Sequence, residues 1–192
     1  AGPVGGARRG RVTGCQEPAE ADCRRPRRHY REPMNSTRVS RHLDAPRAAV
    51  YRALLDADSV SRWRVPDGMT ARVHEFDGRE GGAFRVSLIY DLPTGTGKSD
   101  AQTDTYHGRF VRLVADELVV EEVEFESDDP ALHGTMTMTT TLADAAGGGT
   151  DVTIAHEGLP DVVRPEDNET GTRMALANLA RLVENTPPSS FT

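Results

Sequence analysis

Apolar and polar residues alternate with a period of two from Thr37 to Leu43, which predicts a β-strand at the start of the patterned part of the chain. Asp44-Ala45-Pro46 then predicts the start of a helix, with the proline at its first position. A second, shorter helix is predicted from about Ser59 to Arg64, because Pro66-Asp67-Gly68 stops it. The apolar residues of the first helix follow at the spacing of one helical face: Val50, Tyr51, Leu54 and Leu55.

After Pro66-Asp67-Gly68, apolar and polar residues again alternate with a period of two. Met69 to His74 and Phe84 to Tyr90 each alternate, and Asp77 to Gly82 between them is a strong turn signal. Further strands are predicted over residues 103–114, 117–126, 134–142 and 150–157.

The last predicted element is a long helix that begins at Pro165 and ends at Asn185, ahead of Pro187-Pro188. The order is therefore one strand, two helices, six strands and a long helix. Because the strands follow one another directly, parallel βαβ units are disfavoured, and we predict an α+β domain with helices on one side of an antiparallel sheet. One face of the last helix carries Thr172, Ala175, Leu176, Leu179, Ala180 and Val183.

This order resembles the helix-grip fold of the START-like superfamily, also called SRPBCC, which includes lipid-transfer, birch-allergen-like and polyketide cyclase proteins. Within it, the chain is most similar to the family named for the activator of the heat-shock-protein-90 ATPase. The resemblance covers Thr37 to Glu184. The residues that carry it are Leu43-Asp44-Ala45-Pro46, Val50-Tyr51, Ala53-Leu54, Trp63, Asp77 to Arg85, Gly108-Arg109-Phe110, Leu118-Val119 and Gly149 to Thr153.

The resemblance implies a curved antiparallel sheet of about seven strands wrapped around the C-terminal helix, with an apolar hollow between them. The apolar faces predicted above supply candidate lining residues, although any of them could instead be close-packed core. Many relatives have tryptophan after the glycine that opens the last helix, where this chain has Gly171-Thr172, so we expect a wider cavity or a differently set helix here. The lining candidates are Trp63, Phe84, Val86, Tyr106, Phe110, Met136, Met138, Leu176 and Leu179.

Polar anchors for a ligand are harder to choose, and His107 and Glu122 are the candidates. Four glutamates crowd one strand, and LVVEEVEFES leaves open whether Glu121 or both Glu122 and Glu124 lie on the face opposite the apolar residues. A carboxylate facing an apolar hollow would have a raised pKa and could act as an acid or base. His74, His107, His133 and His156 show no spacing typical of metal ligands, so we expect neither a metal nor a cofactor.

Leu92 to Ser99 superficially resembles a phosphate-binding P-loop because it ends in Gly-Lys-Ser. The motif requires glycine where Leu92 stands, and it requires a helix after Ser99, where the pattern predicts loop and strand. We interpret this segment as a loop.

Charge divides the chain in two. The formal net charge of −7 is the sum of +4 over residues 1–33 and −11 from Met34 onward. An acidic body disfavours nucleic-acid binding, although the arginine-rich leader could act as a basic arm.

Residues 1–36 are a basic leader that we expect to be disordered, because glycine, alanine, proline and arginine bury too little apolar surface. With 22 arginines against the single Lys98, the chain has the skew of a bacterial high-GC genome, in which upstream DNA reads as such residues. We therefore expect the native start near Met34, the folded domain over residues 37–186 and a disordered tail over 187–192. Both cysteines, Cys15 and Cys23, lie in the leader, so the body can have no thiol catalysis, which fits a cytoplasmic protein.

The leading functional hypothesis is non-catalytic binding of a small hydrophobic or amphipathic ligand of unknown identity in this cavity. The first alternative is a polyketide cyclase-like or hydrolase-like enzyme, for which Glu122, His107 and Tyr106 are the residues to test, although no nucleophile elbow is present. The second is a chaperone-interacting protein, which the family resemblance alone implies; members with that role carry an additional domain. No run reaches the ~20 apolar residues of a membrane span, so we expect no membrane insertion.

Overall fold

The computed structural model describes residues 35–92, 97–100 and 102–185. Residues 1–34 of the predicted leader, the native start near Met34, the tail and both cysteines lie outside these residues. The strands are β1 (Thr37–Leu43), β2 (Met69–Phe76), β3 (Ala83–Tyr90), β4 (Thr103–Val114), β5 (Leu118–Phe125), β6 (Met136–Asp144) and β7 (Thr150–Glu157). The helices are α1 (Arg47–Leu54), α2 (Ala57–Trp63) and α3 (Pro165–Glu184), with a one-turn 3₁₀ helix at Pro130–Leu132.

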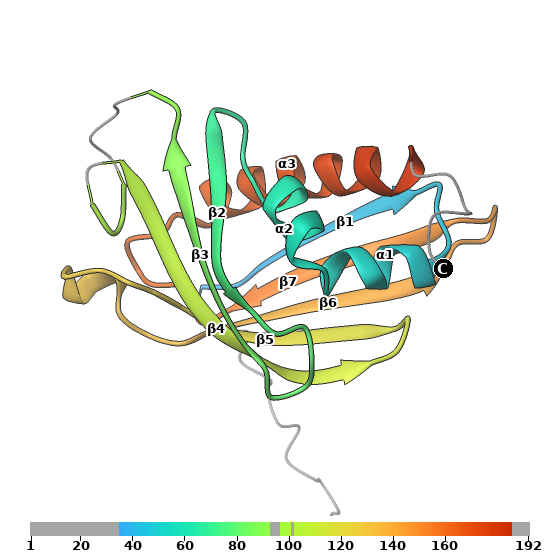
Figure 1. Ribbon diagram of the computed structural model, residues 1–192, viewed down its shortest axis with the longest axis horizontal. Helices are drawn as coiled ribbons and strands as arrows, with labels where there is room; N and C mark the ends of the chain where they lie inside the picture. The colour runs from blue at the N-terminus through green and yellow to red at the C-terminus, as the bar shows by residue number, and fades with distance from the viewer. Residues whose placement is uncertain (1–34, 93–96, 101, 186–192) are drawn as a thin grey trace, which may run out of the picture. The chain divides into compact units, whose positions relative to one another are not determined.

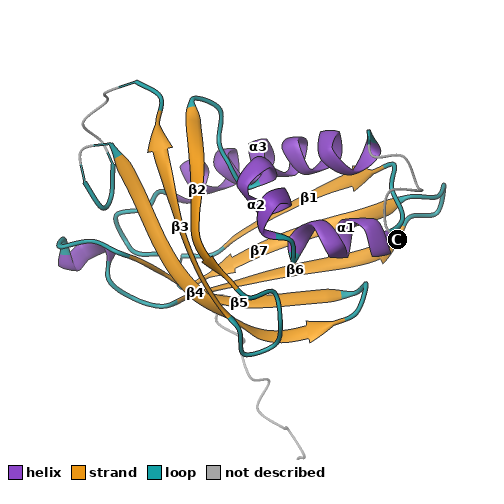
Figure 2. Cartoon of the chain, in the orientation of Figure 1, coloured by secondary structure: helices purple, strands orange, loops and turns teal. Residues whose placement is uncertain are grey.

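The strands form one antiparallel sheet in the order β1-β7-β6-β5-β4-β3-β2. The sheet curls into a half-barrel, and α1, α2 and α3 all lie on its concave side (Figures 1 and 2). Two register shifts, at Val73/Glu75 of β2 and at Phe110/Arg112 of β4, help the strands to bend, because a bulge increases local twist. The predicted helix-grip α+β fold is confirmed.

Helix boundaries show the main differences from the sequence prediction. The sequence predicts Pro46 as the first residue of helix α1. In the structure the helix begins at Arg47, and Pro46 is its N-cap residue. Helix α2 begins at Ala57, two residues before the predicted Ser59, because the Asp56 side chain accepts a hydrogen bond of 2.8 Å from the Ser59 backbone N–H. The aspartate supplies a cap that the apolar spacing alone does not reveal.

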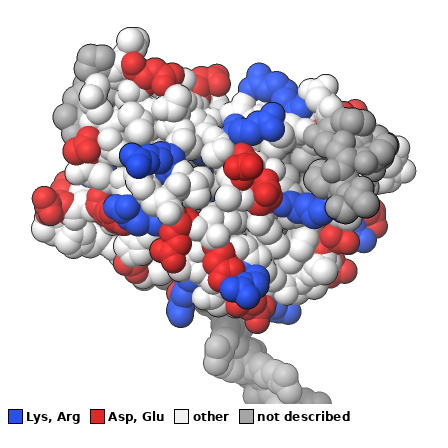
Figure 3. Space-filling view, in the orientation of Figure 1, with Lys and Arg blue, Asp and Glu red and all other residues white. Residues whose placement is uncertain are grey.

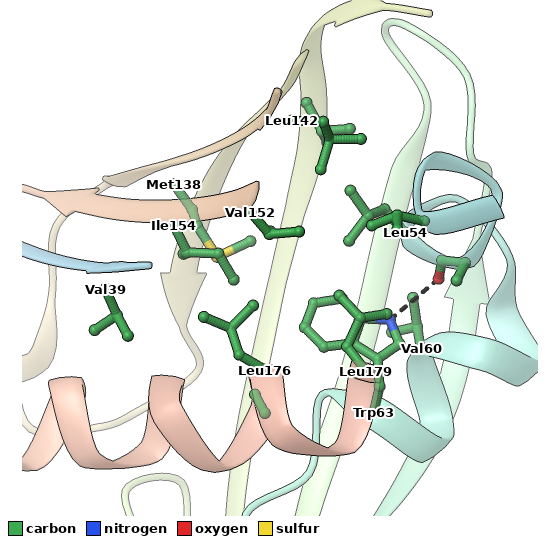
Figure 4. Close-up of a cluster of buried hydrophobic side chains, with 14 of the residues drawn as sticks. Val39, Leu54, Val60, Trp63, Met138, Leu142, Val152, Ile154, Leu176 and Leu179 are labelled. Atoms are coloured by element: carbon green, nitrogen blue, oxygen red, sulfur yellow. Dashed lines mark hydrogen bonds between the residues drawn. The ribbon is translucent and has the colours of Figure 1, made fainter. Parts of the chain in front are cut away.

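A hydrophobic core fills the space between α1, α2, the C-terminal half of α3 and the sheet (Figure 4). The Trp63 indole at the end of α2 is buried, and its N–H donates a 3.1 Å hydrogen bond to the Ala53 carbonyl, which ties α2 to α1. The core residues around it include Leu54, Val60, Leu142, Val152, Leu176 and Leu179.

The outer face of the sheet is polar. Arg109 on β4 forms an ion pair with Glu122 on the neighbouring strand β5, and Arg85 on β3 forms one with Glu126, directly after β5, across the intervening strand β4. Figure 3 shows acidic and basic side chains interspersed on the face that it presents. Among the described residues, no helix is both long and apolar enough to cross a membrane.

Gly108 in β4 allows a close aromatic contact that the curved sheet depends on. Its cross-strand partner is Phe84, and a Cβ at residue 108 would lie 2.6 Å from the Phe84 ring and would also clash with the Glu122 carbonyl oxygen. We expect Gly108→Ala to destabilise the domain by about 2–3 kcal/mol, because the buried ring has no room to move.

The matched control is Gly171→Ala in α3, where a Cβ meets open space. It should leave stability unchanged or raise it by about 0.5–1 kcal/mol, because alanine is the better helix former. Urea unfolding of both variants measures the difference, and equal midpoints would contradict the proposed role of Gly108.

Candidate functional site

A cavity of about 860 Å³ lies between the concave face of the sheet and the N-terminal half of α3. Most of the α3 residues that line it are small or polar, and Met174 is the one large apolar residue that this helix contributes. Leu176 and Leu179 are fully buried in the core, whereas Gly171, Thr172 and Ala175 line the cavity with small side chains. Gly171-Thr172 is thus part of the cavity wall.

The sequence-derived lining residues fall into two groups. Trp63, Tyr106, Met136 and Met138 line the cavity. The others do not line it and are buried in the core: Phe84, Val86, Phe110, Leu176 and Leu179.

Aromatic packing explains why Phe84 and Phe110 do not reach the cavity. The centroids of their rings lie 5.3 Å apart, and the Phe76 ring lies 5.5 Å from Phe110. The three rings therefore pack on one another beneath the helices instead of lining open space.

His107 and Glu122 lie on the outer face, away from the cavity. Glu122 accepts hydrogen bonds from the Arg109 side chain at 2.8 and 2.7 Å, and His107 Nδ1 lies 3.4 Å from a carboxylate oxygen of Glu126. Strand alternation places these residues outward because their neighbours Tyr106 and Val123 point inward. The cavity geometry therefore assigns neither residue a role as a ligand anchor.

Glu121 is the glutamate that faces inward, and it begins a row of cross-strand neighbours. Glu121 on β5 pairs with Met138 on β6, which pairs with His156 on β7, which pairs with Thr37 on β1. Register alone therefore brings one carboxylate, one thioether, one imidazole and one hydroxyl onto the same line across the concave face.

Arg64, directly after α2, covers the Glu121 end of this row. Its guanidinium donates two hydrogen bonds to the Glu121 carboxylate, at 3.0 and 2.9 Å, and a third to Met138 Sδ at 3.0 Å. Burial raises the pKa of Glu121, and the charge of Arg64 acts against that shift. For Arg64, burial acts to lower the pKa, but Glu121 and Tyr106 together raise it above its ordinary value, so the guanidinium stays protonated.

Three aromatic rings complete the surroundings of Arg64. Its Cζ atom lies 5.7, 5.8 and 5.7 Å from the ring centres of Trp63, Phe84 and Tyr106. These cation–π contacts and the carboxylate together hold the side chain in one place.

His156 occupies the middle of the row and lines the cavity. Its Nδ1 lies 3.4 Å from the Thr37 hydroxyl, which donates a 2.5 Å hydrogen bond to Asn168 Oδ1 on α3. Burial lowers the pKa of His156 to about 4, and the charge of Arg64 adds to the effect. The imidazole is therefore neutral near pH 7.

Sequence reasoning did not single out Arg64, Glu121 or His156 as site residues. A signal for Glu121 exists, because it interrupts the alternating series Val119, Val123 and Phe125 on the inward face of β5. No comparable signal exists for Arg64, since one arginine after a short helix is ordinarily exposed.

The P-loop-like segment ends at the rim of the cavity, and residues 93–96 within it lie outside the described part. Lys98 donates both its backbone N–H and its ammonium group to Asp104, each at 2.5 Å, and the next element is the strand β4. The interpretation of this segment as a loop agrees with that geometry. Within the described residues, no group of three or more His, Cys, Asp or Glu side chains could hold a metal ion.

A curled antiparallel sheet around a C-terminal helix, with two short helices after the first strand, defines the START-like helix-grip class. Residues 44–184 match the family model described as "Activator of Hsp90 ATPase homolog 1-like protein", and the chain belongs to that family. This membership supports a ligand-binding or activator-type role in general.

Solved structures of other proteins share this fold. Protein CV1439 from Chromobacterium violaceum is 36% identical, with a TM-score of 0.71, and the match covers 79% of this chain and 99% of that one. The AHSA1 protein SPO3351 from Silicibacter pomeroyi is 15% identical, with a TM-score of 0.64 over 78% of this chain and 97% of that one, and so shows the fold alone. No curated protein sequence matches the chain.

The buried ion pair generates a first prediction for this site. Arg64→Met leaves the Glu121 carboxylate buried without a partner, and we expect it to lower the free energy of unfolding by about 3–5 kcal/mol. The double variant Arg64→Met/Glu121→Leu should recover most of that loss, because both charges are removed together. Arg109→Met breaks the partly exposed pair with Glu122 and should cost less than about 1 kcal/mol. Urea unfolding measures all three, and a double variant no better than Arg64→Met would refute this account.

His156 generates a prediction on acid stability. The unfolded chain binds a proton at His156 near pH 6.5, whereas the folded chain does so only at about 4. Folding is therefore favoured above pH 6.5, and this contribution is lost as the pH falls towards 4. Relative to His156→Gln, the wild-type protein should lose about 2–3 kcal/mol over that interval.

The control is His42→Gln. Hydrogen bonds to Asp151 and Asp44 raise the pKa of His42, so its contribution to stability is present at low pH and is lost as the pH rises. The two difference curves, measured by urea unfolding at several pH values, should slope in opposite directions. Parallel curves would show that His156 is not buried as described.

Proposed function

We propose that the protein binds a small hydrophobic or amphipathic molecule in the cavity beneath the N-terminal half of α3, without catalysing a reaction. The observation that carries this proposal is the cavity itself. Its volume of about 860 Å³ falls within the range of roughly 300–1,000 Å³ that accommodates drug-sized ligands.

The lining supports an apolar guest. Four strands of the sheet, β3, β5, β6 and β7, supply apolar side chains to it: Leu88, Val123, Phe125, Met136 and Ile154. Burial of apolar ligand surface against them would supply the main driving force for binding. Met136 and Met138 add side chains that adapt readily to different shapes.

An enzymatic role is the second candidate because the lining also contains Arg64, Tyr106 and His156. Two observations weigh against it. Arg64 is already bound at two points by Glu121, and the pKa of His156, about 4, makes the imidazole a weak base at neutral pH. The polar groups suit recognition better than proton transfer.

A chaperone partner rests on the family description alone, and no contact among the described residues favours it. A pull-down with the cellular chaperone tests that alternative directly.

The cytoplasm is the location we propose for the binder, because residues 34–192 contain no cysteine and therefore cannot form a disulfide bond.

The proposal predicts that filling the cavity abolishes binding. N-phenyl-1-naphthylamine, an uncharged fluorescent probe, should bind wild-type protein at one site. Ala175→Phe places a ring in the cavity and should weaken the probe at least about tenfold, because the small side chain at this position helps to create the space. Ala177→Phe is the same change on the same helix at a residue that does not line the cavity, and affinity should stay within about twofold.

A thermal-shift screen with lipids, flavonoids and polyketides then identifies the ligand class, since a molecule that binds the native state raises its melting temperature. If the probe fails to bind, or binds equally to the Ala175→Phe and Ala177→Phe variants, the proposed function is wrong.

A further inference from the structure

The imidazole of His156 faces the cavity with one of its ring nitrogens. The side chain lies on the inward face of β7, like Ile154, and it is half-buried in the cavity wall. Nδ1 lies 3.4 Å from the Thr37 hydroxyl. Nε2, on the other side of the ring, has no hydrogen-bond partner among residues 35–92, 97–100 and 102–185, and it is not one of their fully enclosed polar atoms. A molecule in the cavity can therefore reach Nε2.

The hydrogen bonds of Thr37 determine which nitrogen carries the ring proton. A threonine hydroxyl has a single proton, and Thr37 donates it to Asn168 Oδ1 at 2.5 Å. Toward His156 the same oxygen can only accept, so Nδ1 is the protonated nitrogen. The opposite tautomer would set the Nδ1 lone pair against those of the hydroxyl oxygen. Because the pKa of His156 is about 4, the ring is neutral at pH 7 and Nε2 keeps its lone pair.

An apolar guest would leave this lone pair without a partner. The cross-strand neighbour Met138 and the nearby lining residues Ile154 and Leu159 carry no N–H or O–H on their side chains. A guest that fills this part of the cavity excludes water, and a polar atom left dry and unpaired weakens binding. A guest with a hydrogen-bond donor at this point avoids the penalty, because the donor replaces the water.

Charge narrows the donor to a neutral group. Burial lowers the pKa of His156 and the charge of Arg64 adds to the effect, so an alkylammonium head at Nε2 would meet the same two penalties. A carboxylate has no proton to donate at neutral pH, and the described lining offers it no unpaired cation. Each lysine or arginine among the described lining residues is paired with a carboxylate: Arg64 with Glu121, Lys98 with Asp104, and Arg164 with Glu166.

Asn168 favours a hydroxyl among the neutral donors. Its Oδ1 accepts from Thr37, and its Nδ2 group has no acceptor among the described residues. The Asn168 amide and the His156 imidazole thus both contact the Thr37 hydroxyl and offer a donor and an acceptor to the cavity. A hydroxyl both donates and accepts, whereas a carbonyl or ether oxygen only accepts.

We propose that the ligand carries an uncharged hydroxyl group that donates a hydrogen bond to His156 Nε2, so that the cavity selects amphipathic alcohols and phenols over ketones and ethers of the same shape. This inference rests on the proposed function and names the ligand class for the same cavity. His156 is its specificity-determining residue.

The test uses three probes with one carbon skeleton: decan-2-ol, decan-2-one and 2-chlorodecane. Each displaces N-phenyl-1-naphthylamine from the full chain at pH 7.5, after the affinity of that fluorescent probe has been measured for every variant. Wild-type protein should bind the alcohol at least about threefold more tightly than the ketone, because only the alcohol supplies a proton to Nε2.

His156→Phe removes the acceptor and keeps a ring of similar size. It should weaken the alcohol about three- to tenfold and should weaken the ketone and 2-chlorodecane by no more than about twofold, because one hydrogen bond to the alcohol is lost. His107→Phe makes the same change on the outer face of β4, at a histidine that does not line the cavity, and it should change none of these affinities.

Nitrogen-15 NMR of the imidazole provides a second measurement, made on the wild-type protein. Protonated and unprotonated ring nitrogens differ strongly in chemical shift, and the His156 signals are assigned by their absence from the His156→Gln spectrum. At pH 7.5 Nδ1 should be protonated and Nε2 unprotonated, and decan-2-ol should shift the Nε2 signal more than decan-2-one does. A ring proton on Nε2 would overturn this inference, whatever the variants do.

The outcomes separate the two proposals. If the fluorescent probe binds but the wild-type protein does not prefer the alcohol, this inference is overturned and the cavity function stands. The same holds if His156→Phe weakens the alcohol, the ketone and 2-chlorodecane alike. If the fluorescent probe does not bind the wild-type protein, the proposed function fails and this inference fails with it.

Discussion

The cavity depends on one constraint, which is that α3 presents small side chains to the concave surface of the sheet over one turn of its length. Leu176 and Leu179 pack fully into the core and anchor the helix against α2 and the sheet. One turn earlier, Gly171, Thr172 and Ala175 present little more than backbone to the same concave surface. Because the helix is rigid and its C-terminal half is fixed, its N-terminal half cannot collapse onto the sheet, and about 860 Å³ remains open.

The ion pair between Arg64 and Glu121 closes one end of this space and determines its chemistry. Two buried charges are tolerated only because each satisfies the other at two points and three aromatic rings surround the cation. For the same reason neither charge is free to engage a guest. Arg64 is therefore best understood as a fixed part of the wall that positions Tyr106 and lowers the pKa of His156.

The sequence predicted the fold well and the site only in part. Strand and helix periods, turn residues and family motifs together define the helix-grip architecture, because each depends on local spacing. Of the site, Trp63, Tyr106, Met136 and Met138 lie on apolar faces that periodicity identifies. Periodicity cannot separate them from Phe84 or Leu179, since a lining side chain and a core side chain follow the same pattern. The sequence does not identify Arg64 or His156 as site residues, because their positions depend on contacts between residues far apart in the sequence.

The pairing register of the strands brings the polar residues of the cavity together. Glu121, Met138, His156 and Thr37 are consecutive cross-strand neighbours on four adjacent strands, and Asn168 joins the row from α3. A slip of one residue in β5 would turn Glu121 outward and Glu122 and Glu124 inward, where Arg64 could pair with at most one of them, so the buried ion pair also opposes misregistration. The polar end of the cavity is therefore built on hydrogen-bonded strands and on α3, with Arg64 added from the segment directly after α2, and this framework holds its side chains in place.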